Sequence, residues 1–476
     1  MSDDETPEEN TGALTRRGLL KNGLAATASI AAIAATGAAI AQSNTSEPSG
    51  KRSTPARKFR AWVSRGEGRN RTTLQELTLR PIKGRQVVVR TEAASLCYFN
   101  VSTVLGMRPE VDPKSVPPAM RAFQEKANSM AIIQGHGGVG IVEAVGPEVR
   151  RVKVGDRVCV SGTPQCGVCY QCLRGRSDMC QFLGPAQVPG NLTQIAQMRD
   201  GTPVHANSEI GGLAELMVTY EEWVVPVASK ASAAELGMVC SCVSVAGLGA
   251  TTSQGTATLL PGSTAAVMGC GPLGLSAVQG ARIAGASTII AVDPISARRE
   301  VARKLGATYV LDPNAEGDRL VAKVQEISMR ANPSVWGGGR TAGMMLGGAG
   351  ADFVVEAVGA DWIAPKSEAG PDPTGVLPMR QAYDMVAGGG HLVTTGLPSG
   401  AISFPAALFS IGGRTHHAGQ AGGCSPLRDI PRFVSLLDSG KFDAKTMLTS
   451  VVPFDRVVEA YEDVAYRMTV FAIMTV

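Results

Sequence analysis

The chain has 476 residues, of which 44% are apolar and 18% charged, and this composition is sufficient for two globular domains. The net charge of +4 is spread along the sequence without a basic block, which argues against a nucleic-acid partner. The 56 glycines are typical of a chain whose backbone approaches turns and a ligand closely.

The first 41 residues have the features of an export signal. Arg16-Arg17 is followed by an alanine-rich apolar run that ends in an Ala-x-Ala cleavage site at Ala39-Ile40-Ala41. The arginine pair is typical of the twin-arginine route, which implies the twin-arginine translocase as a partner during export and a periplasmic or extracellular destination. An uncleaved membrane anchor and a tail without function are the alternatives. The polar, Ser/Pro-rich residues 42–57 are typical of a linker.

From Arg60 to about Val227 the chain alternates short β-branched runs with Gly and Pro turns. Two examples are the runs 86–90 and 139–146. This pattern predicts a small, strongly bent β domain.

Four cysteines within this region have the spacing of a metal site: Cys166-x2-Cys169-x2-Cys172-x7-Cys180. Four thiolates this close can surround one tetrahedral Zn²⁺ with Zn–S bonds of about 2.3 Å, and such a closed site is structural. Two local disulfides are the alternative, because an exported protein meets an oxidising compartment. Since the twin-arginine route moves folded proteins, the metal can be loaded in the reducing cytoplasm, and the two predictions agree.

A dinucleotide-binding pattern follows. An apolar strand over 265–268 leads into Gly-x-Gly-x-x-Gly, then a helix-like stretch over 275–284 and a second strand over 288–292 that ends in Asp293. In this order of elements the backbone approaches a pyrophosphate at the positive end of the helix. The candidate cofactor contacts are Gly269, Gly271, Pro272, Leu273, Gly274, Asp293 and Arg298.

The acidic residue at the end of the second strand favours NAD over NADP. The Asp293 carboxylate would accept hydrogen bonds from the adenosine ribose hydroxyls and repel a 2′-phosphate, and Arg298 and Arg299 temper this preference without reversing it. The alternative for the glycine turn is a glycine-rich loop that binds no nucleotide.

Further strands over 309–311, 352–356 and 391–396 predict a parallel sheet with helices on both faces.

From about Lys58 to the C-terminus the chain resembles the zinc-containing alcohol dehydrogenases of the medium-chain dehydrogenase/reductase superfamily. The resemblance rests on the cysteine motif, the glycine turn, the run Val154-Gly155-Asp156-Arg157-Val158 and the motif Gly135-His136-Gly137-Gly138. It implies an α/β chain with a GroES-like β-rich catalytic domain over 58–242, including the cysteine lobe 166–180. A Rossmann NAD-binding domain over 243–412 and a return to the catalytic domain over 413–476 complete it, and a homodimer or homotetramer is implied.

The resemblance also implies a catalytic zinc on Cys97, His136 and Cys242, in addition to the structural zinc, with NAD as the second cofactor. Cys240 is the rival of Cys242, whose offset from Gly247 fits the family better. The implied reaction is hydride transfer between a zinc-bound alcohol, or the corresponding aldehyde, and NAD. No disulfide is expected.

Three residues near the implied zinc depart from the family. Phe99 stands where alcohol-oxidising members carry Ser or Thr, Asn100 where they carry Asp, and Gly137 where they carry Glu. Ser102 is therefore a candidate for the proton relay, with a zinc-bound water as the alternative. Phe99 indicates a more apolar cleft, suited to a bulky or aromatic alcohol.

Three stretches lengthen the chain relative to the family, around residues 109–127, 331–349 and 361–378. The first predicts either a loop and helix over the substrate cleft or a plain surface insertion. Near the C-terminus, Phe471 occupies the place of a common pyrophosphate arginine, for which Arg467 is the candidate substitute.

Three alternatives to a conventional dehydrogenase remain open at this point. Because free NAD is scarce outside the cytoplasm, the chain could be a nicotinoprotein with tightly bound NAD that is recycled in place. It could also be a zinc- or nucleotide-binding protein that has lost alcohol oxidation, and an uncleaved leader would indicate a membrane-attached redox partner.

Overall fold

A computed structural model describes residues 57–107, 118–254, 257–329, 349–361, 363–404 and 411–476. The predicted signal peptide, residues 1–41, and the linker up to residue 56 lie outside the described residues. Almost all of the predicted insertion 331–349 also lies outside them.

The β-rich lobe contains a closed barrel of five strands and a second sheet of seven strands. The barrel follows the order β1 (Lys58–Ser64), β2 (Thr72–Leu79), β7 (Gln194–Gln197), β8 (Pro203–Ala206), β4 (Ala131–Ile133). The second sheet follows the order β10 (Val224–Pro226), β6 (Arg157–Val160), β5 (Gly138–Val145), β3 (Gln86–Ser95), β18 (Ala472–Thr475), β17 (Ser450–Pro453), and β9 (Leu216–Tyr220) also pairs with β3. Since β18 pairs with β3, the end of the chain completes this lobe.

The second lobe is a six-stranded sheet in which every pair of neighbours is parallel. Its order is β13 (Tyr309–Leu311), β12 (Thr288–Val292), β11 (Thr264–Met268), β14 (Ala351–Glu356), β15 (Val386–Thr394), β16 (Thr415–Ala418). Alternate residues of β11 enter two separate cores: Ala265 and Val267 belong to one, Ala266 and Met268 to the other. Both faces are therefore covered, which confirms the predicted doubly wound fold.

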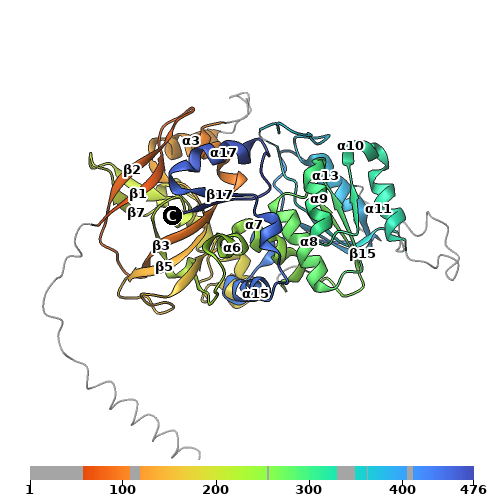
Figure 1. Ribbon diagram of the computed structural model, residues 1–476, viewed down its shortest axis with the longest axis horizontal. Helices are drawn as coiled ribbons and strands as arrows, with labels where there is room; N and C mark the ends of the chain where they lie inside the picture. The colour runs from red at the N-terminus through yellow and green to blue at the C-terminus, as the bar shows by residue number, and fades with distance from the viewer. Residues whose placement is uncertain (1–56, 108–117, 255–256, 330–348, 362, 405–410) are drawn as a thin grey trace, which may run out of the picture. The chain divides into compact units, whose positions relative to one another are not determined.

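Helices cover these two faces (Figure 1). The core on one face includes residues of α8 (Pro272–Ala284) and α9 (Ser296–Leu305), and the core on the other includes residues of α11 (Leu320–Ser328) and α13 (Val376–Met385). The other α-helices within the described residues are α2 (Val101–Leu105), α3 (Pro118–Ser129), α4 (Tyr170–Leu173), α5 (Leu183–Ala186), α6 (Ala233–Val239), α7 (Cys242–Thr252), α10 (Pro313–Glu316), α15 (Pro426–Asp438), α16 (Ala444–Met447) and α17 (Val457–Ala465).

The parallel sheet extends beyond the limits that the sequence pattern predicts. β16 pairs with β15 after residue 412, where the predicted cofactor domain ends. β16 carries the exposed polar residues Thr415 and His416 instead of an apolar run, so it lacks the usual strand pattern. β15 begins at Val386, whereas the sequence pattern predicts a start at residue 391. The predicted start is too late because three consecutive glycines separate Val386 and Ala387 from the rest of the strand.

α7 and α8 are in close contact at glycine positions. A Cβ at Gly247 of α7 would lie 2.2 Å from the carbonyl oxygen of Leu273, and one at Gly280 of α8 would lie 2.0 Å from Thr251 Oγ1. Cys242 is the first residue of α7 and Pro272 is the first of α8. The glycines therefore let α7, which carries the predicted metal ligand Cys242, approach α8, which follows the glycine turn.

No single helix among the described residues is long and apolar enough to cross a membrane. α6 and α7, with a bend of 50° between them, reach that length and composition only as a pair. Most of their residues are buried within the protein itself.

The close contact of α7 with α8 predicts that Gly247→Ala is destabilising. The added methyl group would overlap backbone and side-chain atoms of α8, and such overpacking costs about 1–3 kcal/mol. Gly184→Ala is the matched control, because Gly184 is also helical and a Cβ there meets nothing within 4 Å. Denaturant unfolding of both variants measures the difference, and equal stabilities would contradict this account of the helix contact.

Candidate active site

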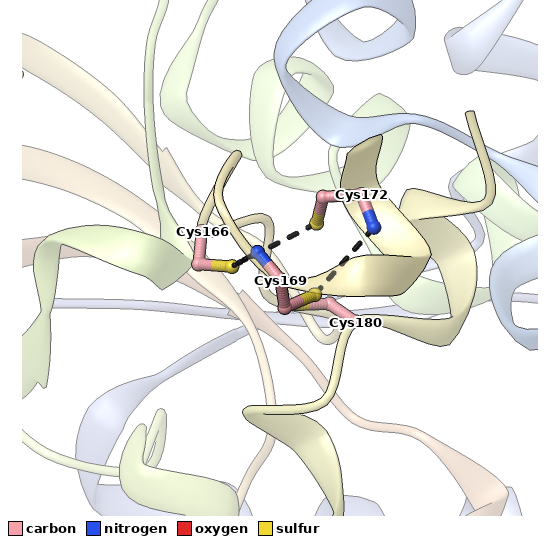
Figure 2. A group of neighbouring side chains, drawn as sticks. All are labelled: Cys166, Cys169, Cys172 and Cys180. Carbon is pink, nitrogen blue, oxygen red and sulfur yellow. Dashed lines mark hydrogen bonds between the residues drawn. The ribbon is translucent and has the colours of Figure 1, made fainter. Parts of the chain in front are cut away.

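The four cysteines of the lobe 166–180 surround one point (Figure 2). The Sγ atoms of Cys166 and Cys172 are 3.9 Å apart, and those of Cys169 and Cys180 are 4.0 Å apart. Two sulfurs on one tetrahedral zinc with 2.3 Å bonds would be about 3.8 Å apart, whereas a disulfide bond is about 2.05 Å long. All four residues are free cysteines, so the geometry matches a closed metal site and not the disulfide alternative.

Backbone N–H groups support thiolates in this lobe. The N–H of Cys169 donates to Cys166 Sγ over 3.2 Å, and the N–H of Cys172 donates to Cys169 Sγ over 3.5 Å (Figure 2). Burial opposes ionisation, but the N–H groups of Gln181 and Cys172 lower the pKa of Cys169 to about 6. A thiolate is the form that binds metal, and Cys169 is the member of the set that ionises most readily, whereas burial raises the pKa of Cys172 and Cys180.

The second predicted metal set also converges, and it comes from three separate elements. Cys97 precedes a short 3-10 helix after β3, His136 lies between β4 and β5, and Cys242 begins α7. His136 Nε2 lies 3.0 Å from Cys242 Sγ, and the Cys242 thiol lies 3.6 Å from Cys97 Sγ. The hydrogen bond from Cys242 and the neighbouring His136 hold the pKa of Cys97 well below its usual value despite burial.

Asn100 orients the imidazole of this cluster. Its Oδ1 lies 2.7 Å from His136 Nδ1, and Asn100 is only 1% exposed. The amide oxygen can accept the Nδ1 proton, which leaves the lone pair of Nε2 directed toward the two cysteines. The sequence marks Asn100 as a departure from the family, but its oxygen provides the acceptor that a metal-binding histidine requires.

The rival cysteine lies elsewhere. Cys240 is buried, and its carbonyl oxygen accepts a weak hydrogen bond from Cys159 Sγ over 3.6 Å. It does not belong to either of the two metal-competent groups found among the described residues. The geometry therefore favours Cys242, as the family offset predicts.

Phe99 lies directly against the group formed by Cys97, His136 and Cys242. Its ring meets the His136 ring edge-on with centroids 5.6 Å apart, and the residue is 52% exposed. Ser102, the predicted proton relay, lies one turn further on in α2 and is not among the residues that line the adjoining cavity. The side chain beside His136 is thus an aromatic ring, at the position where alcohol-oxidising members of the family carry Ser or Thr.

The glycine turn has the shape that a dinucleotide needs. Gly269 has a φ of +90°, and a Cβ at Gly274 would lie 1.7 Å from the Gly269 carbonyl oxygen. Gly271 caps the N-terminus of α8, and a Cβ there would meet nothing closer than Arg298 at 3.8 Å. The first and third glycines are needed for the turn itself, whereas the second leaves room beside the positive end of the helix.

Asp293 joins this turn to the second strand. Its carboxylate accepts from the N–H of Cys270 over 2.7 Å and from the N–H of Ile295 over 2.8 Å. Burial raises the pKa of this carboxyl. The two neighbouring arginines differ: Arg299 donates to the backbone carbonyl of Asp293, whereas Arg298 lines the cavity.

One cavity of about 300 Å³ connects these groups. Its wall includes Cys97, Phe99, Gly271 and Asp293. The described residues of α3, from the insertion predicted to overhang the cleft, do not contribute to this wall. Instead, residues from the insertion 361–378 do.

A further cluster at the same cavity leaves no signal in the sequence. The guanidinium of Arg467 lies 3.8 Å from the centre of the Tyr98 ring and forms an ion pair with Asp361. All three residues line the cavity. The arginine was a candidate pyrophosphate contact, but only the fold reveals its partner in the insertion.

Comparisons with known proteins agree with this geometry. The model of the alcohol dehydrogenase GroES-like domain matches residues 83–229, and that of the zinc-binding dehydrogenase domain matches residues 272–367. The two matches follow the order of the two lobes. Both lobes thus match the zinc-type medium-chain dehydrogenase/reductase family.

Relatives in this family cover most of the chain. The putative alcohol dehydrogenase D of Mycobacterium tuberculosis is 29% identical over 82% of this chain and 92% of its own length. The NDMA-dependent alcohol dehydrogenase of Amycolatopsis methanolica is 28% identical over 82% of this chain and 91% of its own. Benzyl alcohol dehydrogenase of Acinetobacter calcoaceticus superposes with a TM-score of 0.68 at 26% identity, covering 88% of this chain and 99% of its own.

The two cysteine-containing groups predict two zinc ions per chain. Cys169→Ser should lose one zinc and melt at a lower temperature, because the closed cluster ties down its own lobe. Cys97→Ser should lose the other zinc. Elemental analysis of the purified variants measures both effects.

Cys240→Ser is the control for this experiment and should retain both ions, since Cys240 lies outside both groups. Loss of zinc from Cys240→Ser, or a full complement in Cys97→Ser, would contradict the assignment of ligands.

Proposed function

We propose that the chain catalyses the zinc- and NAD-dependent interconversion of an alcohol and its aldehyde. The observation that carries this proposal is that one cavity is lined both by Cys97 of the predicted catalytic metal set and by Gly271 and Asp293 of the dinucleotide pattern. Two thiols and one imidazole are a donor set that suits a catalytic zinc with one open position. Zinc would supply a Lewis acid for the substrate oxygen, and NAD would accept or donate the hydride.

The residues of the chain would orient the reacting groups. Asn100 fixes the His136 ring through Nδ1, so that Nε2 remains a ligand. The N-terminus of α8 and the space beside Gly271 suit a pyrophosphate. The carboxylate of Asp293 retains lone pairs for the ribose hydroxyls, which favours NAD over NADP.

The proton has a route to solvent near Phe99. Phe99 carries no hydroxyl group, whereas alcohol-oxidising members of the family have Ser or Thr at this position. Ser102, the other candidate hydroxyl, does not line the cavity. Phe99 is 52% exposed at the cavity wall beside His136. We therefore favour exchange with water at this point over a relay through Ser102.

The substrate is proposed to be a bulky or aromatic alcohol. The Phe99 ring beside the metal cluster offers an apolar contact surface, where a hydroxyl would favour small polar substrates. The similar solved structure of a benzyl alcohol dehydrogenase supports the same class.

Phe99→Ser tests the substrate class. We expect kcat/KM for benzyl alcohol to fall by about tenfold relative to that for ethanol, because the substrate loses an aromatic contact and the site gains a hydroxyl. Tyr170→Ser, which removes an exposed aromatic ring from the cysteine lobe, should leave the ratio unchanged.

An unchanged ratio in Phe99→Ser would refute the proposed preference. Zinc-loaded protein that turns over no alcohol or aldehyde would instead support the binding protein that has lost oxidation, as the residues Phe99 and Gly137 allow.

We also propose that the enzyme works outside the cytoplasm with NAD that it carries with it. The twin-arginine pattern at Arg16-Arg17 motivates the first part, and the scarcity of free NAD outside the cell motivates the second. As the family resemblance implies, we further propose a homodimer or homotetramer.

The export proposal predicts that Arg16→Lys combined with Arg17→Lys retains the protein in the cytoplasm with an uncleaved leader. The conservative change keeps the charge and removes the arginine pair that the export route reads. Arg52→Lys, in the predicted linker, should be exported normally. Cell fractionation with immunoblotting measures the outcome, and equal export of both variants would contradict the twin-arginine route.

A further inference from the structure

The insertion between β14 and α13 forms part of the cofactor cavity. We refer to its described residues, 361 and 363–378, as the strap; in Figure 1 it is the coil between α17 and α13. Pro365, Glu368, Gly370 and Pro371 line the same cavity as Asp293 and Arg298. An insertion that lies on the surface alone would not contribute to this wall.

One side of the strap is attached to the β-rich lobe. Lys366 Nζ lies 3.9 Å from the centre of the Tyr466 ring, and the Lys366 N–H donates to the Tyr466 carbonyl oxygen over 3.1 Å. The N–H of Ile363 donates to the Tyr98 hydroxyl oxygen over 3.2 Å. Tyr98 follows Cys97 directly, so these contacts reach the segment that carries a metal ligand.

The other side is attached to the parallel-sheet lobe near Asp293. Ser296 Oγ donates to Glu368 Oε1 over 2.6 Å, and Asn314 Nδ2 donates to the Ala369 carbonyl oxygen over 2.9 Å. The Ser296 hydrogen bond lowers the pKa of Glu368, so this carboxylate is ionised at neutral pH. The strap thus runs from one lobe to the other past the predicted adenosine site.

The base of the strap is held by its own hydrogen bonds. The Asp372 carboxylate accepts from the N–H groups of Thr374 and Leu377, which fixes the turn into α13. The N–H of Asp361 donates to the Pro373 carbonyl oxygen over 2.7 Å, which closes the base. Only the middle of the strap, from Ile363 to Pro371, would have to lift to open the cavity.

We propose that the strap retains the dinucleotide by closing over its adenosine half. This inference rests on the proposed function, because it requires NAD in the cavity. The contacts of Lys366 and Glu368 must break before the nucleotide can leave, so they slow dissociation without touching the reacting atoms. Such retention would let the folded protein keep its cofactor through export.

The test compares nucleotide release from three forms of the full chain: wild type, the double variant Lys366→Ala/Glu368→Ala, and Glu300→Ala. Glu300 is an exposed carboxylate on α9 that pairs with Arg303 and lies outside the cavity, so it is the matched control. Each form is loaded with NADH and mixed with excess NAD, and the loss of bound NADH fluorescence gives the dissociation rate. Zinc content and melting temperature are measured in parallel.

We expect the double variant to release NADH about tenfold faster than the wild type, with unchanged zinc content and melting temperature. The Glu300→Ala control should match the wild type. Equal release rates in all three forms would overturn the strap and leave the proposed function intact. A wild type that binds neither NADH nor NADPH would overturn the proposed function, and the strap with it.

Discussion

The contact between α7 and α8 determines the arrangement of the site. The first residue of α7 is Cys242, and its neighbour Val243 lines the same cavity as Gly271 at the start of α8. Because Gly247 and Gly280 allow the two helices to touch without intervening side chains, the N-termini of both open onto one cavity. The metal cluster and the dinucleotide turn come from different lobes, and this contact is the direct link between them.

Neighbouring hydrogen-bond groups hold the ligand atoms of both cysteine clusters in position. In the lobe 166–180, backbone N–H groups point at the sulfurs, and in the second cluster Asn100 holds His136 in one ring orientation. Preorganisation of this kind reduces the ordering that metal binding must impose. It also suits a protein that is proposed to load zinc before it reaches an oxidising compartment.

Local spacing was sufficient to predict the closed cysteine site and the glycine turn, because in both cases the ligating or turning atoms lie within a few residues of each other. Cys97, His136 and Cys242 could be paired only through the family resemblance, since they are far apart in sequence. The role of Asn100 and the contacts of the strap could not be predicted, because they depend on tertiary neighbours such as His136, Tyr466 and Ser296. β16 escaped detection because an exposed edge strand carries no apolar pattern.

We have proposed that the chain is exported and that it carries its own NAD. The most direct measurement is the nucleotide content of the mature protein, isolated from the exported fraction without added cofactor, denatured and analysed for released NAD(H) and NADP(H). The account predicts close to one NAD(H) per chain and little NADP(H). Exported protein that is free of nucleotide would contradict it.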